Sequence, residues 1–152
     1  MRRTVIIQAI AAATIILFVY ASLSKLMAYP LFTAQLEMHP LLRPFAGWLA
    51  WAVPAAELLV AALLVIPSTR LMGLYGSAIL LFMFTVYLTV MILTDKHLPC
   101  SCGGLISRFT WRQHIVFNLV FLAIAITGIL LNRKRTKDIV ATIHPNSSMG
   151  VN

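Results

Sequence analysis

Four long apolar stretches alternate along the chain with short segments that collect the polar, charged and turn-forming residues. Each stretch is long enough, at a rise of about 1.5 Å per residue, to cross a hydrocarbon layer of roughly 30 Å as an α-helix. The stretches run from Val5 to Ala28, Trp48 to Ile66, Leu71 to Leu93 and Trp111 to Leu131. The pattern therefore predicts an all-α integral membrane protein, built as a four-helix transmembrane bundle.

The connections between these stretches differ in character. The first, residues 29–47, carries three prolines together with Glu37 and His39, so it is too interrupted to be a fifth span. Its apolar residues predict a short helix that lies at the membrane interface and covers the bundle. The second, Pro67 to Arg70, is tight and makes spans two and three antiparallel neighbours. We expect one membrane domain over residues 1–132 and a basic, disordered tail over residues 133–152.

The charge pattern indicates the orientation in the membrane. The chain is 61% hydrophobic and has a net charge of +8, but its basic residues lie at the edges of the spans. This placement does not suit nucleic acid, and the basic residues after the last span favour anionic lipid headgroups instead. With the N-terminus in the cytoplasm, seven Lys and Arg residues lie on that side and five on the other. The positive-inside rule then predicts that both termini are cytoplasmic and that the first and third connections lie on the opposite side of the membrane.

The third connection contains the only two cysteines of the chain, Cys100 and Cys102, which are separated by one residue. Pro99 precedes them and Gly103 and Gly104 follow, as is typical of a turn-rich loop at the membrane surface. A disulfide between positions i and i+2 requires a bent backbone, which the glycines permit. It closes almost no loop and adds little stability, whereas a strained, exposed bridge exchanges readily. On an oxidising face of the membrane, the pair therefore predicts thiol–disulfide exchange.

Two alternatives stay open for this pair. One is a zinc site, since four ligands could come from His97, Cys100, Cys102 and His114. However, cysteines separated by one residue crowd a tetrahedral site, so we expect no metal. The other alternative is a passive, reduced pair. In the redox interpretation, His97 is a candidate acid or base near the thiols.

Basic and aromatic residues surround the end of this connection. Arg108 and Arg112 favour the thiolate form of nearby cysteines, or alternatively anchor the chain at the interface. Trp111 begins the fourth span, where an indole suits the interface. Asn118 should face the bundle interior, because an amide in lipid seeks an interhelical hydrogen bond. Trp111 and Asn118 are expected to form a floor beneath the cysteine loop.

Lys25 and Glu57 are ionisable groups within the apolar stretches, where an unpaired charge costs a few kcal/mol. Either an ion pair between them or a protonated Glu57 would relieve that cost. A pair would fix the register of two helices, and could also relay protons or bind a headgroup; we prefer the structural role.

Five features follow one another along the chain: "YASLSKL" at the end of the first span, "PAAEL" in the second, "PCSCGG", a tryptophan, and "FN" in the fourth. Their order resembles the methylamine utilisation protein MauE family, within the broader group of DoxX-like redox-associated membrane proteins. By this resemblance, the family's Cys-x-Cys corresponds to Cys100 and Cys102, its lysine to Lys25, its acid to Glu57, and its tryptophan and asparagine to Trp111 and Asn118.

The resemblance implies a bacterial inner-membrane protein that supports disulfide formation or electron supply in the periplasm. Its partner would be a thioredoxin-like protein, either periplasmic or tethered to the membrane. In methylamine metabolism, the family member assists maturation of the disulfide-rich small subunit of methylamine dehydrogenase. These implications favour a thiol–disulfide oxidoreductase component, and whether the chain is itself an enzyme stays open.

One departure limits the mechanism. Membrane enzymes that pass electrons from thiols to quinone generally use two cysteine pairs, whereas this chain has one. The chain cannot run that relay alone. Quinone is the one cofactor that the sequence suggests, and it could dock beside the cysteine loop near Trp111. The alternative from another class is a non-catalytic membrane adaptor or scaffold with incidental or metal-binding cysteines. A transporter is less favoured because few polar residues lie within the spans.

Overall fold

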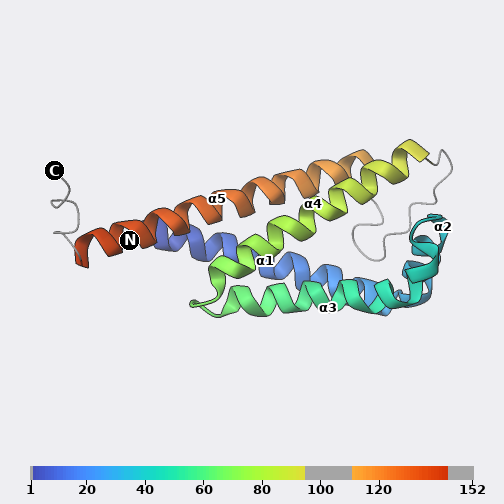
Figure 1. The fold of residues 1–152 in the computed structure, drawn as a ribbon, viewed down its shortest axis with the longest axis horizontal. Helices are drawn as coiled ribbons and strands as arrows, with labels where there is room; N and C mark the ends of the chain where they lie inside the picture. Colours follow the sequence, from blue (N-terminus) through green and yellow to red (C-terminus); the bar gives the residue numbers. More distant parts are fainter. Residues whose placement is uncertain (1, 95–110, 144–152) are drawn as a thin grey trace, which may run out of the picture.

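The computed structural model describes residues 2–94 and 111–143, which form helices without any strand. The helices are α1 (Arg2–Met27), α2 (Tyr29–Met38), α3 (Ala46–Val65), α4 (Arg70–Thr94) and α5 (Trp111–Ile143), with a short 3-10 helix at Arg43–Phe45 (Figure 1). Four helical segments are long and apolar enough to cross a membrane: Arg3–Met27 in α1, Arg43–Val65 in the 3-10 helix and α3, Arg70–Leu93 in α4, and Gln113–Lys134 in α5. The predicted all-α bundle of four spans, with a short helical segment between the first two, is confirmed.

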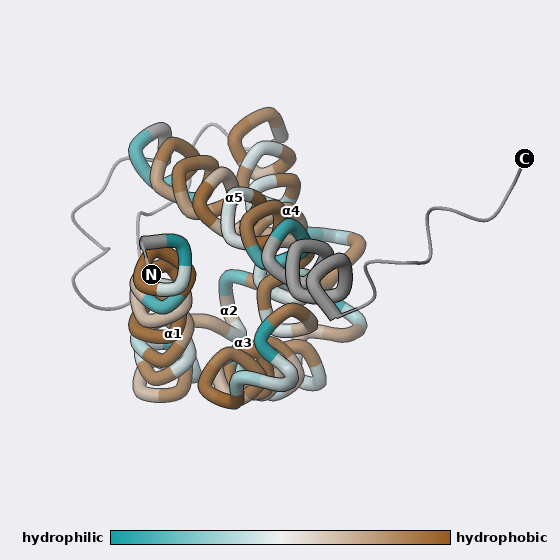
Figure 2. The backbone as a smooth tube through the Cα atoms, turned by 90° about the vertical axis from the view of Figure 1, so that its left-hand side faces the viewer, coloured by the Kyte–Doolittle hydropathy of each residue, from teal (hydrophilic) through white to brown (hydrophobic). Residues whose placement is uncertain are grey.

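The outer surface of the bundle is apolar. Figure 2 shows hydrophobic residues on every side of the helices, not only on the faces that pack together. Each long helix has a large apolar side chain that is more than half exposed: Ile16, Leu59, Ile79 and Leu130. A soluble protein rarely leaves so continuous an apolar surface in water, whereas lipid tails cover it without cost. The architecture is that of a multi-pass membrane protein.

The long helices run alternately up and down and pack most extensively as two pairs, α1 with α3 and α4 with α5 (Figure 1). Helix α1 begins and helix α5 ends at the same end of the bundle. The opposite end, called the α2 end from here on, holds α2, the last turns of α1 and α4, and the first turns of α3 and α5. Each pair is therefore antiparallel.

A tight turn joins α3 to α4, as the sequence predicts. The Thr69 hydroxyl donates to the carbonyl of Leu63 at 2.9 Å, and Arg70 Nε donates to that of Leu64 at 3.2 Å. These bonds satisfy carbonyls that the end of a helix leaves without backbone partners. Gly73 lets the two helices approach closely, since a Cβ there would lie 2.9 Å from the backbone nitrogen of Leu64. Spans two and three are thus antiparallel neighbours.

Helix α2 packs on the start of α3 rather than continuing α1. Pro30 lies in its first turn, where a missing N–H costs no helical hydrogen bond. Leu36 of α2 is buried against Ala46 and Ala50 of α3. This contact turns the chain across the α2 end, in the way expected for a short covering helix.

Helix α5 differs from the expectation at its C-terminal end. The sequence predicts disorder from residue 133 onward, but α5 continues to Ile143. Residues 132–143 contain neither Pro nor Gly and include good helix formers, so a helix already formed in the membrane propagates without a new nucleus. Residues 144–152 lie outside the part that the structure describes.

Candidate functional site

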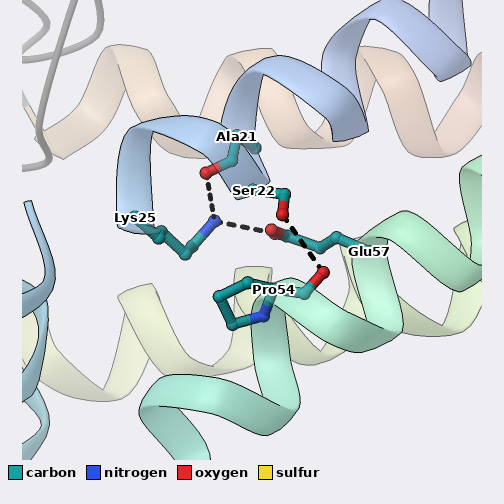
Figure 3. Close-up of polar contacts among 5 residues, drawn as sticks. All are labelled: Ala21, Ser22, Lys25, Pro54 and Glu57. Carbon is teal, nitrogen blue, oxygen red and sulfur yellow. Dashed lines mark hydrogen bonds and ion pairs between the residues drawn. The ribbon is translucent and has the colours of Figure 1, made fainter. Parts of the chain in front are cut away.

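The charged centre of the α2 end is an ion pair between α1 and α3. Lys25 Nζ donates to Glu57 Oε1 at 2.7 Å and to the carbonyl of Ala21 at 3.4 Å (Figure 3). The Glu57 side chain is 0% exposed and that of Lys25 is 23% exposed. Of the two solutions that the sequence allowed for these charges, the ion pair is confirmed.

A second polar contact lies beside the pair. The hydroxyl of Ser22 donates to the carbonyl of Pro54 at 3.1 Å (Figure 3). Ser22 precedes Lys25 by three residues and Pro54 precedes Glu57 by three, so each pair of neighbours shares one face of its helix. The two contacts together fix both the rotation and the axial position of α1 against α3. Ser22 was not among the expected site residues, although it lies in the same "YASLSKL" segment as Lys25.

Aromatic rings lie close to the ammonium group of Lys25. Its Nζ lies 5.1 Å from the ring centroid of Phe84 on α4 and 5.9 Å from that of Phe32 on α2. Both distances suit a cation–π attraction, which is strongest where water is excluded. Lys25 is therefore held by side chains of three other helices.

A cavity of about 290 Å³ opens next to the ion pair, and it is only partly closed off from the outside of the bundle. All five α-helices contribute to its wall, which is mostly hydrocarbon and includes the aromatic rings of Phe18, Phe32, Phe84, Tyr87 and Phe117. Its polar lining residues are Ser24, Lys25, Gln35, Glu57, His114 and Asn118. Apolar pockets with a few convergent polar groups are typical ligand sites.

Two of the predicted site residues reach this cavity from α5. His114 and Asn118 both line it, because a spacing of four residues puts them on one face of the helix. Asn118 is 6% exposed, which confirms that its amide faces the interior. One cavity thus brings together four predicted site residues from three helices: Lys25, Glu57, His114 and Asn118.

Glu57 retains an unused acceptor. Its Oε2 atom is buried and has no hydrogen-bond partner among the described residues. Lys25 retains donor capacity as well, since an ammonium has three N–H groups and the described contacts use two, to Ala21 and Glu57. Buried polar groups are normally satisfied, so an unpaired carboxylate oxygen next to a cavity suggests that a bound molecule supplies the donor.

The remaining predicted residues belong to the connection between α4 and α5. Four of them, His97, Cys100, Cys102 and Arg108, lie outside the described residues. The zinc set, which needs His97, Cys100 and Cys102 together with His114, therefore has no structural test. Trp111 and Arg112 form the first turn of α5, but their side chains are also outside the description. Within the described ranges, no three His, Cys, Asp or Glu side chains gather in a way that could hold a metal.

The helix ends that flank this connection lie near the cavity. Tyr87 and Leu88 from the last two turns of α4 line it, and so do His114 and Phe117 from the first two turns of α5. Because residues 95–110 join these two helix ends, the cysteine segment begins and ends at the α2 end of the bundle.

Comparison with known proteins agrees with the resemblance seen in the sequence. Neither the curated proteins nor the solved structures give a match to this chain. A family model described as methylamine utilisation protein MauE matches residues 3–131, a range that takes in the ion pair, the cavity and the cysteine segment. The chain is therefore a multi-pass membrane protein that belongs to the MauE family.

Proposed function

We propose that the chain is a redox component of the bacterial inner membrane whose Cys100 and Cys102 exchange disulfides with a thioredoxin-like partner in the periplasm. The observation that carries this proposal is the placement of the only two cysteines, one residue apart, between two membrane-spanning helices. Such a pair is too close in sequence to act as a staple and is suited to exchange. The family membership agrees with this function without specifying it.

The proposal includes an orientation, with both termini in the cytoplasm and the α2 end toward the periplasm. Two observations support it. Seven Lys and Arg residues fall on the proposed cytoplasmic side and five on the other. The start of α1 and the end of α5 lie at the same end of the bundle (Figure 1).

In the proposed exchange, a thiolate of the partner attacks the Cys100–Cys102 disulfide and forms a mixed disulfide, with one cysteine of the pair released as a thiolate. The second thiol of the partner then attacks the mixed disulfide. The partner leaves with a disulfide, and the pair leaves as a dithiol that has gained two electrons and two protons. Arg108 and Arg112 would favour the thiolate states in this sequence of steps.

The test uses single substitutions of the two cysteines. In one of the variants Cys100→Ser and Cys102→Ser, we expect a mixed disulfide with the partner to accumulate, and in the other we expect it to disappear. Ser101→Ala is the matched control, because it changes the residue between the two thiols and keeps both. If both cysteine variants complement a deletion strain as well as wild type does, the redox proposal is wrong.

Thiol labelling separates exchange from the alternatives. With a membrane-impermeant maleimide on intact spheroplasts, labelling of Cys100 and Cys102 should increase after treatment with a reductant. Labelling that never changes with redox state would favour an adaptor, and labelling only after the membrane is permeabilised would contradict the orientation. Stoichiometric zinc in the purified protein would favour the metal interpretation instead.

A further inference from the structure

We propose that the cavity at the α2 end binds the ring of an isoprenoid quinone and of the corresponding quinol, with Lys25 and Glu57 as its polar contacts. This inference deepens the proposed function, on which it rests for the source of electrons. The binding site itself is argued from residues of α1 to α5.

The size and lining of the cavity suit a flat ring. At about 290 Å³ it is at the small end of ligand pockets, which are commonly about 300–1,000 Å³. It can therefore hold one ring system but not the two acyl chains of a phospholipid. Aromatic side chains of α1, α2, α4 and α5 line it, and aromatic groups pack well against other rings. Because the cavity is only partly closed, an apolar tail could leave it toward the lipid.

The polar groups suit both redox states of such a ring. A quinone carbonyl is an acceptor, and the remaining N–H of Lys25 is a donor beside the cavity. A quinol hydroxyl is also a donor, and Oε2 of Glu57 is a buried acceptor that no described residue satisfies. Among the residues that the structure describes, the ion pair therefore leaves one donor and one acceptor unused, which is what the oxidised and reduced rings respectively require. A hydrocarbon chain would use neither.

The location also fits an electron acceptor for the cysteine pair. The segment that contains Cys100 and Cys102 connects two helix ends whose nearby residues line the cavity. In the balanced reaction, the dithiol loses two electrons and two protons and becomes a disulfide, while the quinone takes up both and becomes the quinol. A single cysteine pair is then sufficient if the ring accepts electrons from it directly.

Binding can be measured without the partner. We would titrate the full-length protein in phospholipid nanodiscs with decylubiquinone and with menadione, and follow the quenching of tryptophan fluorescence against empty nanodiscs. We expect saturable binding of one ring per chain. Quenching that never saturates would overturn the proposal. Native mass spectrometry would also overturn it if a phospholipid occupied the cavity and quinone did not displace it.

Filling the cavity provides a matched pair of variants. Ala21 lines the cavity, whereas Ala13 is exposed two turns earlier on the same helix. Ala21→Leu should weaken binding at least tenfold, and Ala13→Leu should leave it within twofold of wild type. If Ala21→Leu does not fold, Ser24→Leu places a similar side chain in the same cavity. Unchanged binding in a folded cavity-filling variant would show that the ring binds elsewhere.

The role of Glu57 has a readout that depends on the redox state of the ring. In Glu57→Gln, an amide N–H can replace the unused carboxylate oxygen, so the position can offer a donor instead of an acceptor. We expect the variant to weaken quinol binding at least tenfold more than quinone binding. A purely structural role of Glu57 would weaken both forms equally, and that result would overturn the assignment.

The two proposals fail in different ways. A Cys100→Ser/Cys102→Ser double variant should bind decylubiquinone as tightly as wild type while it loses exchange with the partner. If exchange occurs but no quinone binds, the redox function stands and the quinone site does not. If quinone binds but the thiols never change their redox state, the site stands and the cysteine chemistry does not.

Discussion

The Lys25–Glu57 pair leads to a prediction about stability that depends on which partner is removed. We consider Lys25→Met, Glu57→Leu and the double variant, in which apolar side chains replace charged ones. The two charges are not equivalent, because the Glu57 side chain is completely buried and that of Lys25 is 23% exposed.

The distance and burial give the expected magnitudes. At 2.7 Å, with an effective dielectric constant of about 20, the Coulomb attraction is about 6 kcal/mol, and the desolvation of both groups offsets part of it. Lys25→Met leaves a buried carboxylate without its counter-charge and should cost about 3–5 kcal/mol of unfolding free energy. Glu57→Leu leaves a cation whose flexible stem can move the ammonium toward water, so we expect about 1–3 kcal/mol. The double variant should be as stable as wild type or more stable.

The assay is reversible unfolding in dodecylmaltoside micelles with increasing amounts of SDS, followed by tryptophan fluorescence. Lys134→Met is the matched control, since Lys134 is an exposed lysine on α5 and its replacement should change the unfolding free energy by less than about 0.5 kcal/mol. The reasoning is refuted if Glu57→Leu costs as much as Lys25→Met, or if the double variant is less stable than both single variants.

Two further predictions concern the packing of the helices and use the same unfolding assay. Ser22→Ala removes the interhelical hydrogen bond to the carbonyl of Pro54 and should cost about 0.6–1.5 kcal/mol; no change would show that the bond is not formed in the membrane. Gly73→Ala places a Cβ 2.9 Å from Leu64 and should lower the free energy of unfolding by about 1–3 kcal/mol. A Cβ at Gly47 would have nothing within 4 Å, so Gly47→Ala should raise the free energy of unfolding by about 0.4–1 kcal/mol. Equal effects at the two glycines would contradict the close approach of α3 and α4.

The fold was largely predictable because lipid imposes simple requirements on the sequence. A span must be long, apolar and helical, so its position can be identified without any knowledge of packing. The ion pair was predictable for a related reason, since Lys25 and Glu57 each needed a partner within the bundle. The extension of α5 beyond Leu131 was not expected, because the apolar pattern ends there and only the helix propensity of residues 132–143 indicates a longer helix.

The cavity was not predictable from local patterns. It depends on how the α1–α3 pair and the α4–α5 pair are placed relative to each other, and that geometry results from packing along the whole bundle. The same limitation applies to His114, which the sequence suggested as a metal ligand and the structure brings to the cavity wall beside Asn118. Oε2 of Glu57 has no partner in the described part of the chain because of a detailed arrangement of side chains, which no spacing rule predicts.

The two partners of the ion pair reach the membrane at different times during synthesis. A ribosome delivers α1 to the membrane before it has made α3, and Glu57 follows Lys25 by 32 residues. At a synthesis rate of about 5–20 residues per second, these 32 residues take about 2–6 s to make, and for that time Lys25 has no counter-charge. During that interval, the ammonium must stay near the headgroups or beside the insertion machinery, because hydrocarbon disfavours it. When α3 arrives, Glu57 gives the ammonium of Lys25 a counter-charge inside the bundle, so the final position of α1 depends on a span that is made after it.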